Sequence, residues 1–298
     1  MNSALLFVLC TLIWGSTWIA ITFQIGETSE VLAVAWRYTI ASVCLGVFCL
    51  VKRNTLSYPR HMHIKMAAVG LFLFCLNYTL LYMAQEHIVS ALLALLSSSI
   101  IYFNVVLRWW WLKQPIKREV VVGATFGLVG ICCLFAPEFS SVSMSTGLII
   151  GLVVAMLSFV SAAVGGVVSE RALNLGVPVM PMNFYAMTYA TVFLYIAALI
   201  SGESMIIPTS ASFYWSLLYL ALFGSVLAFG AYMKLVKQIG ADKAAYVVLM
   251  YPIVALIIST FFEGYSWSWL SVFGVAVVLW GNAIAMGKIA MFVRKPAD

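Results

Sequence analysis

The chain alternates between long apolar runs and short polar breaks. Most runs hold about 20 residues, the length that an α-helix needs to cross the hydrocarbon core of a bilayer. The pattern predicts an all-α integral membrane protein with ten transmembrane helices. The predicted helices are 3–23, 30–51, 65–85, 88–111, 119–136, 146–169, 181–201, 212–236, 242–262 and 267–288.

Basic and acidic residues fall in different connections between the predicted helices. All but one of the 16 basic residues fall near the even-numbered connections or in the C-terminal tail, whereas the odd-numbered connections carry only acidic residues. Cytoplasmic loops of membrane proteins carry an excess of Lys and Arg, so both termini are predicted to be cytoplasmic. The net charge of +6 belongs to this topology and to contact with anionic headgroups of the lipid bilayer. Nothing in it suggests nucleic acid as a partner.

Composition supports a membrane protein. The chain is 64% hydrophobic and 9% charged, with a mean hydropathy of +1.06, which leaves too little polar surface for a soluble globule. The N-terminal run lacks the basic start of a signal peptide and is interpreted as an uncleaved first helix. All six cysteines lie inside apolar runs, so no metal site or cofactor is predicted. We expect a multi-pass protein of the plasma membrane, which is the inner membrane in a bacterium.

An internal repeat divides the chain into residues 1–143 and 144–298. Gly123 and Gly130 in the fifth helix have counterparts in Gly274 and Gly281 of the tenth. Each half holds five helices, an odd number, so the halves are predicted to have inverted topology with a substrate site near the membrane midplane. The glycine faces of helices five and ten predict close packing, and a homodimer through them is possible.

Seven short segments lie in order along the chain. They are 14–18 (WGSTW), 36–38 (WRY), 123–130 (GATFGLVG), 219–225 (YLALFGS), 239–246 (IGADKAAY), 251–255 (YPIVA) and 262–264 (FEG). Together they resemble the EamA family of the drug/metabolite transporter superfamily. The resemblance covers nearly the whole chain and implies a ten-helix carrier of small organic metabolites, often an exporter of amino acids. The sequence departs from the family pattern in helix four, where Tyr102, Phe103 and Asn104 stand in place of a proline that would mirror Pro252.

Arg37 is the one basic residue outside the cytoplasmic set, about 10 Å below the predicted outer surface. A buried cation needs a partner or water. One hypothesis is that Arg37 binds a substrate carboxylate or locks an outer gate. The alternative is an arginine that snorkels or bonds carbonyl groups and only fixes helix packing.

Polar and aromatic stripes supply the other candidates. Asn104 lies near the middle of helix four and can both donate and accept hydrogen bonds, which suits a small polar ligand. Interhelical hydrogen bonding or core packing would explain most stripe residues equally well. The predicted substrate-binding residues are Trp14, Arg37, Tyr78, Tyr82, Ser98, Tyr102, Asn104, Ser225 and Tyr232. The predicted gating residues are Trp18, Tyr251 and Pro252.

The placement of titratable groups bears on mechanism. The acidic residues are predicted at helix ends or in loops, so we expect uniport or exchange without an obligatory buried proton relay. A flippase for lipid-linked or phosphorylated headgroups is a second hypothesis, with Arg37 as its only cationic support. A membrane enzyme is a third, for which His61 and His63 are the sole candidate pair.

Overall fold

The computed structural model describes residues 2–113, 115–116, 118–140, 146–203, 205–239, 244 and 246–285. These residues form helices, turns and short connections, with no strand among them. The predicted boundary between the two halves, at 143–144, lies outside the described residues. The same holds for Lys117, Lys243 and the basic tail from 286 to 298.

The first half contains α1 (Ser3–Thr22), α2 (Glu30–Val51), a continuous helix made of α3 (Arg60–Val69), η1 (Gly70–Leu76) and α4 (Asn77–Gln85), a second made of α5 (Ser90–Leu96), η2 (Ser97–Ser99) and α6 (Ile100–Leu112), and α7 (Arg118–Ser140). The second half contains α8 (Thr146–Asn174), α9 (Val179–Ile200), a continuous helix made of α10 (Ala211–Leu218), η3 (Tyr219–Leu227) and α11 (Ala228–Ile239), α13 (Tyr246–Phe262) and α14 (Trp269–Ala285).

The all-helical membrane class is confirmed. Among the described residues, 7 helices are long and apolar enough to cross a membrane, and two shorter apolar stretches, Met250–Phe262 and Trp269–Ala285, accompany them. Each predicted range overlaps a helix, and several helices run further than the sequence indicated. The count of ten spans, the inverted repeat and the cytoplasmic termini stay predictions.

Local sequence signals set the helix ends. Ser29 and Ser210 cap α2 and α10 because their hydroxyl groups accept hydrogen bonds from the backbone of Leu32 and Phe213. Gly202 and Gly264 follow α9 and α13 with φ of +65°. That left-handed conformation strains residues with a Cβ, so glycine ends these helices.

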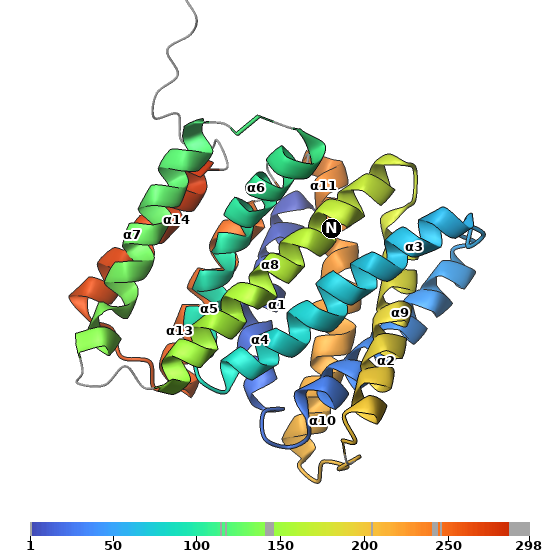
Figure 1. The fold of residues 1–298 in the computed structure, drawn as a ribbon, viewed down its shortest axis with the longest axis horizontal. Helices are drawn as coiled ribbons and strands as arrows, with labels where there is room; N and C mark the ends of the chain where they lie inside the picture. Colours follow the sequence, from blue (N-terminus) through green and yellow to red (C-terminus); the bar gives the residue numbers. More distant parts are fainter. Residues whose placement is uncertain are drawn as a thin grey trace, which may run out of the picture.

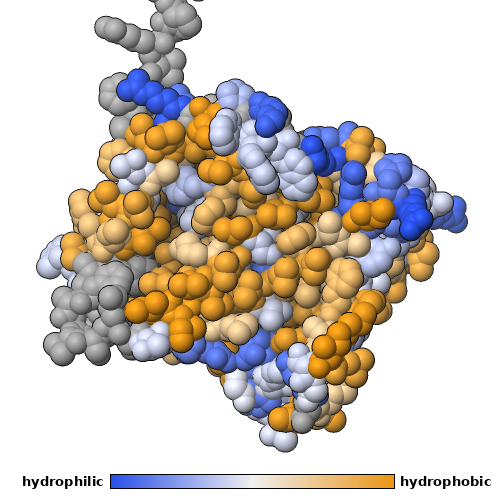
Figure 2. All heavy atoms as spheres, viewed as in Figure 1, coloured by the Kyte–Doolittle hydropathy of each residue, from blue (hydrophilic) through white to orange (hydrophobic). Residues whose placement is uncertain are grey.

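The helices form a flattened bundle (Figure 1) in which α7 lies along α14 at one side and α2 lies along α9 at the other. Between them, α1 contacts α11 and α13, and α8 crosses α4 and α6. Figure 2 shows a broad hydrophobic band with hydrophilic residues gathered toward its edges. The band has the character of a lipid-facing surface.

The glycine faces of α7 and α14 pack against each other within one chain. A Cβ on Gly123 would lie 2.4 Å from the Gly281 carbonyl oxygen, and one on Gly130 would lie 2.7 Å from that of Gly274. The two backbones therefore touch at positions where only glycine fits. Packing through these glycines is confirmed, but the faces are occupied inside the chain. A homodimer stays a prediction and would need the outer faces of the two helices.

Three helices depart from regular α geometry. The segments η1 and η3 are π-helical, a rare form that often marks functional sites. They belong to helices three and eight of the predicted order, which are equivalent positions in the two halves. Helix four contains the 3₁₀ turn η2, and α13 contains Pro252. Helix four thus has an irregular turn although it lacks the proline.

Candidate functional site

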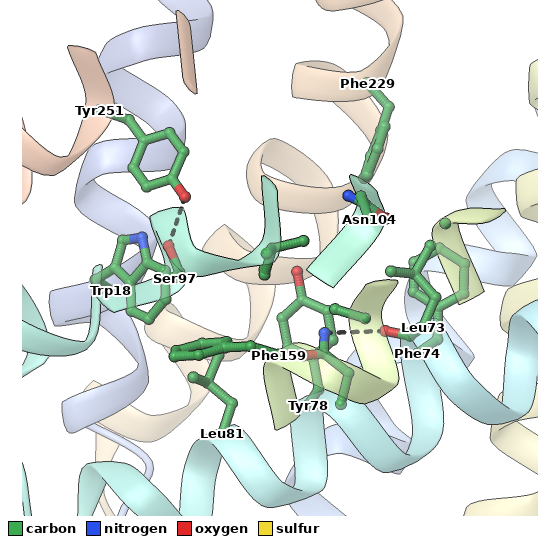
Figure 3. Close-up of a pocket in the computed structure, with 14 residues that line it drawn as sticks. Trp18, Leu73, Phe74, Tyr78, Leu81, Ser97, Asn104, Phe159, Phe229 and Tyr251 are labelled. Carbon is green, nitrogen blue, oxygen red and sulfur yellow. Dashed lines mark hydrogen bonds between the residues drawn. The ribbon is translucent and has the colours of Figure 1, made fainter. Parts of the chain in front are cut away.

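A cavity of about 320 Å³ lies among six of the helices (Figure 3). Its wall is mainly apolar and aromatic, with a few polar tips, which is the usual character of a small-molecule site. The lining residues are Trp18, Leu73, Phe74, Asn77, Tyr78, Leu81, Ser97, Ile100, Asn104, Phe159, Ala162, Gly166, Phe229 and Tyr251. Four of the predicted residues, Trp18, Tyr78, Asn104 and Tyr251, are brought together here.

Asn77 belongs to the wall through the π-helical segment. Its Nδ2 donates to the Leu73 carbonyl oxygen at 3.1 Å, and its Oδ1 accepts from the Ser158 hydroxyl at 2.8 Å. The Ser161 hydroxyl donates to the Phe72 carbonyl oxygen at 2.7 Å. These side-chain bonds join η1 to α4 and α8, and the Asn77 amide is engaged by Leu73 and Ser158.

Asn104 has a different environment. Its amide makes no hydrogen bond to any other residue in the described part of the chain. Gly166 on α8 faces it, and a Cβ there would lie 3.4 Å from the Asn104 Oδ1. Figure 3 shows the amide beside Phe229 at the cavity. Asn104 is half-buried and its amide can both donate and accept hydrogen bonds, so it is the polar wall group best placed for a ligand.

Arg37 lies behind the wall. Its side chain is only 2% exposed, and its Cζ stands 4.6 Å from the centroid of the Tyr78 ring. Its Nε donates to the Ser225 hydroxyl at 3.4 Å, while Nη1 has no hydrogen-bond partner among the described residues. Arg37 therefore does not snorkel. It reaches the cavity through Tyr78 and is not itself a lining residue.

Helix four, at its 3₁₀ turn, and α13, beside Pro252, meet at the cavity. The Tyr251 hydroxyl and the Ser97 hydroxyl are 2.7 Å apart, which joins α13 to η2. The Tyr251 ring stacks on Trp18 with centroids 6.4 Å apart. Pro252 is the next residue, and its missing N–H leaves the Val248 carbonyl without its helical donor. The predicted gating residues thus lie beside one another, although Pro252 does not line the cavity.

One helical turn beyond Trp18 and Leu81, a hydrogen-bonded cluster joins the helices. We name it the acidic-end closure, because Glu263 is its centre. Glu263 accepts from the Ser259 hydroxyl at 2.5 Å, and from the Ser90 hydroxyl and backbone at 2.6 and 3.3 Å. Gln85 Nε2 donates to the Thr22 hydroxyl at 3.0 Å, and that hydroxyl donates to Glu263 at 3.4 Å. The closure joins α1, α4, α5 and α13.

One helical turn beyond Asn104 and Gly166, at the other end of the cavity, Arg108 and Glu170 form an ion pair of 3.0 Å. Their side chains are 40% and 33% exposed. We name this pair the basic-end closure. It joins α6 to α8, so the cavity has a polar contact beyond each of its ends.

The remaining predicted site residues lie outside the cavity wall. Trp14 packs on Phe229 and Tyr232, with ring centroids 5.7 and 5.1 Å apart. The Tyr102 hydroxyl donates to the Gly123 carbonyl oxygen and to Asn282 Oδ1, both at 3.0 Å.

Tyr82, Ser98 and Ser225 also make packing contacts. The Tyr82 hydroxyl donates to Gln24 Oε1 at 2.9 Å. Ser225 donates to the Leu220 carbonyl oxygen at 3.0 Å, and Ser98 is buried. The interhelical hydrogen bonding that the sequence left as an alternative fits Tyr82 and also Ser225, which accepts from Arg37. The buried Ser98 hydroxyl has no hydrogen-bond partner among the described residues.

Sequence reasoning missed Asn77, Phe159 and Gly166 as wall residues. The signal for Asn77 was present, since an amide inside an apolar run is expensive and marks a special environment. Phe159 and Gly166 gave no signal, because they resemble ordinary packing residues of a membrane helix.

Comparison with known proteins agrees with this arrangement. The sequence pattern of the EamA-like transporter family matches residues 1–136 and 149–287. The chain belongs to the EamA-like transporter family. The family and its named relatives are transporters rather than enzymes.

Several curated relatives match this EamA chain over most of their length. The uncharacterized inner membrane transporter YedA of Escherichia coli (strain K12) is 28% identical, with 96% of this chain and 90% of the relative covered. The uncharacterized transporter YvbV of Bacillus subtilis is 26% identical, with coverage of 88% and 84%. Protein PagO of Salmonella typhimurium is 22% identical, with coverage of 88% and 86%. The predicted location in the plasma membrane is confirmed by the apolar helices together with the inner-membrane relatives.

A protein of known crystal structure shares the fold of this EamA chain. The TM-score is 0.68 at 18% sequence identity, and the match covers 95% of this chain and 96% of the other. At this identity the likeness concerns the fold alone.

Proposed function

We propose that this EamA protein carries small organic metabolites, amino acids and related compounds among them, across the plasma membrane by alternating access. The observation that supports the proposal best is the placement of a polar contact one turn beyond each end of a cavity of about 320 Å³. Opening one contact while the other stays closed would expose the cavity to one side at a time.

The proposed topology has ten spans, arranged as two inverted five-helix repeats over 1–143 and 144–298, with both termini cytoplasmic. The family pattern matches the chain twice, at 1–136 and 149–287, which supports two related halves. The π-helical segments in helices three and eight support the same division. The segregation of basic residues supports the orientation.

Within this mechanism, Tyr78 and Asn104 bind the substrate, and Arg37 acts from behind Tyr78 as a positioning residue. Trp18 and Tyr251 form the movable wall toward the acidic-end closure, and Pro252, next to Tyr251, loosens α13. Driving force comes from the substrate gradient, because the polar groups of the described wall are amides, hydroxyls and an indole rather than carboxylates.

Counterflow in liposomes tests the proposal. The full chain is reconstituted, loaded with unlabelled metabolite and supplied with the radiolabelled form, using a panel of amino acids and related organic acids without an imposed pH gradient. We expect uptake that Asn104→Leu reduces at least about tenfold, because it removes the unpartnered amide. The control Tyr195→Phe removes a hydroxyl that contacts Thr39 outside the cavity and should leave uptake unchanged.

Two outcomes contradict the proposal. Equal uptake by wild type and Asn104→Leu would show that transport does not use this cavity. Movement of fluorescent lipids between leaflets without any metabolite counterflow would favour a flippase.

A further inference from the structure

A positive charge stands one aromatic ring behind the cavity wall. The Arg37 guanidinium is buried against the Tyr78 ring, with a Cζ–centroid distance of 4.6 Å, and against the Tyr38 ring at 5.4 Å. In the part of the chain that the structure describes, the ion pair is Arg108–Glu170, and Arg37 has no carboxylate partner. A buried cation without a counter-ion is costly, so an anion that reaches the neighbouring cavity is favoured there.

The cation also changes the phenol that separates it from the cavity. A cation held against an aromatic face attracts the electrons of the ring. The O–H group of Tyr78 therefore becomes a stronger hydrogen-bond donor. Figure 3 shows this hydroxyl pointing toward the middle of the cavity, on the side where the Asn104 amide lies.

Three of the other polar tips of the wall are already engaged. Ser97 and Tyr251 bind each other, and Asn77 is bound by Leu73 and Ser158. The indole of Trp18 lies beside Ser97 (Figure 3). Tyr78 and Asn104 are therefore the pair of donors left on the opposite side of the cavity for an acceptor group of the ligand. Donors that meet a negatively charged acceptor form hydrogen bonds roughly twice as strong as neutral ones.

The same wall is unfavourable for an ammonium group. Among its described lining residues there is no Asp or Glu, and the Arg37 charge repels cations. The rest of the wall suits an apolar body, since Leu81, Phe159 and Phe229 are among its members.

We propose that the cavity selects amphipathic organic monocarboxylates over zwitterions and cations, with Tyr78 and Asn104 holding the carboxylate and Arg37 supplying the field. This selectivity rests on the proposed function, because it assigns the substrate class of the same site. It narrows the amino-acid expectation toward acids that lack an α-amino group.

Four probes with one phenyl body separate the charge types: 3-phenylpropanoate, phenylalanine, 2-phenylethylamine and 3-phenyl-1-propanol. Binding of each to the purified full chain in lipid nanodiscs is measured by calorimetry. We expect 3-phenylpropanoate to bind at least about tenfold more tightly than phenylalanine, and 2-phenylethylamine to bind most weakly, given the Coulomb energy of a charge near a buried cation.

Variants test the assigned roles. Tyr78→Phe keeps the ring against Arg37 and removes the donor, so it should weaken 3-phenylpropanoate at least about tenfold while changing 3-phenyl-1-propanol less. Arg37→Gln should remove the preference for the acid, and Arg37→Lys should keep most of it because the charge remains. Tyr195→Phe is the matched control and should bind like wild type. If Arg37→Gln does not fold, the binding results for Tyr78→Phe and Arg37→Lys still test the proposed selectivity.

Binding of phenylalanine as tight as that of 3-phenylpropanoate, tightest binding of the amine, or binding of none of the four would overturn the selectivity. Transport is scored separately by counterflow. Selective binding without flux would defeat the transport function and leave the selectivity standing. Flux of phenylalanine with no response to 3-phenylpropanoate would defeat the selectivity and leave the transport function standing.

Discussion

The two closures of the cavity are built differently. At the acidic end, one carboxylate gathers hydrogen bonds from Thr22, Ser90 and Ser259, which belong to three helices. At the basic end, a single pair joins Arg108 to Glu170 with both side chains more than 30% exposed, at 40% and 33%. Hydrogen bonds to a charged group contribute about 1.5–3 kcal/mol each, whereas exposed ion pairs contribute about 0–1 kcal/mol. The acidic-end closure is therefore the stronger of the two contacts, and the proposed mechanism predicts that the basic end opens more easily.

Helix four takes part in both closures. Ser90 stands at its start and Arg108 near its end, and the 3₁₀ turn η2 lies between them. A 3₁₀ stretch inside a helix often marks a hinge. In the proposed mechanism this turn would let the two ends move separately. The Ser97–Tyr251 contact joins η2 to α13 next to Pro252.

Removing the centre of the acidic-end closure should have the largest effect. Glu263→Ala leaves the Ser90 hydroxyl and backbone without their acceptor. We expect the free energy of unfolding to fall by about 3 kcal/mol, after discounting for a half-buried site, and amide exchange across 86–96 to rise. Glu203→Ala is the control, because Glu203 accepts from Ser29 at another helix pair. Exchange that rises equally in both variants would argue against a special role for Glu263.

Straightening α13 should have the next largest effect. Pro252→Ala restores a backbone donor for the Val248 carbonyl and should stabilise the folded state by about 2 kcal/mol. Because the acidic end would then open less readily, counterflow should slow. Pro178→Ala, just before α9, is the matched control in melting and flux measurements. Faster flux in Pro252→Ala would rule out the hinge.

The hydroxyl contact between Ser97 on η2 and Tyr251 on α13 should contribute a smaller free energy. A double-mutant cycle of Ser97→Ala and Tyr251→Phe should give a coupling of about 1 kcal/mol, with reduced flux in both single variants. Ser16 and Tyr219 form a control pair of the same chemistry, 2.6 Å apart and outside the cavity. Its cycle should show coupling in stability and no change in flux. A flux effect of equal size in both pairs would remove the assignment of a gate.

The basic-end closure should give the smallest change in stability. Glu170→Gln should alter the free energy of unfolding by less than about 1 kcal/mol. Salt should raise amide exchange across 100–112 in wild type, since it screens a half-exposed pair, and should have little effect in the variant. A large loss of stability would instead show that the two closures contribute similarly to the free energy of unfolding.

The apolar runs predicted the positions of the helices because a membrane span must satisfy its own backbone. Of the predicted site residues, Tyr78, Asn104, Trp18 and Tyr251 line the cavity, and their roles in binding and gating stay predictions. Side-chain direction was harder, since one residue along a helix is about 100° around it. Tyr102, close to Asn104 in sequence, thus turns away to Asn282. Arg37 was the more instructive case, because only tertiary contacts show that an aromatic ring separates it from the cavity.

The π-helical segment η1 has a mechanical consequence. A π-helix fits more residues into a given rise than an α-helix does, so η1 holds spare length within helix three. Conversion of those turns to α-helix would shift Tyr78 and Leu81 along the helix axis and rotate them about it, while α3 stays in place. In the proposed mechanism, helix three would thus move its part of the cavity wall without bending, and η3 would give helix eight the same capacity.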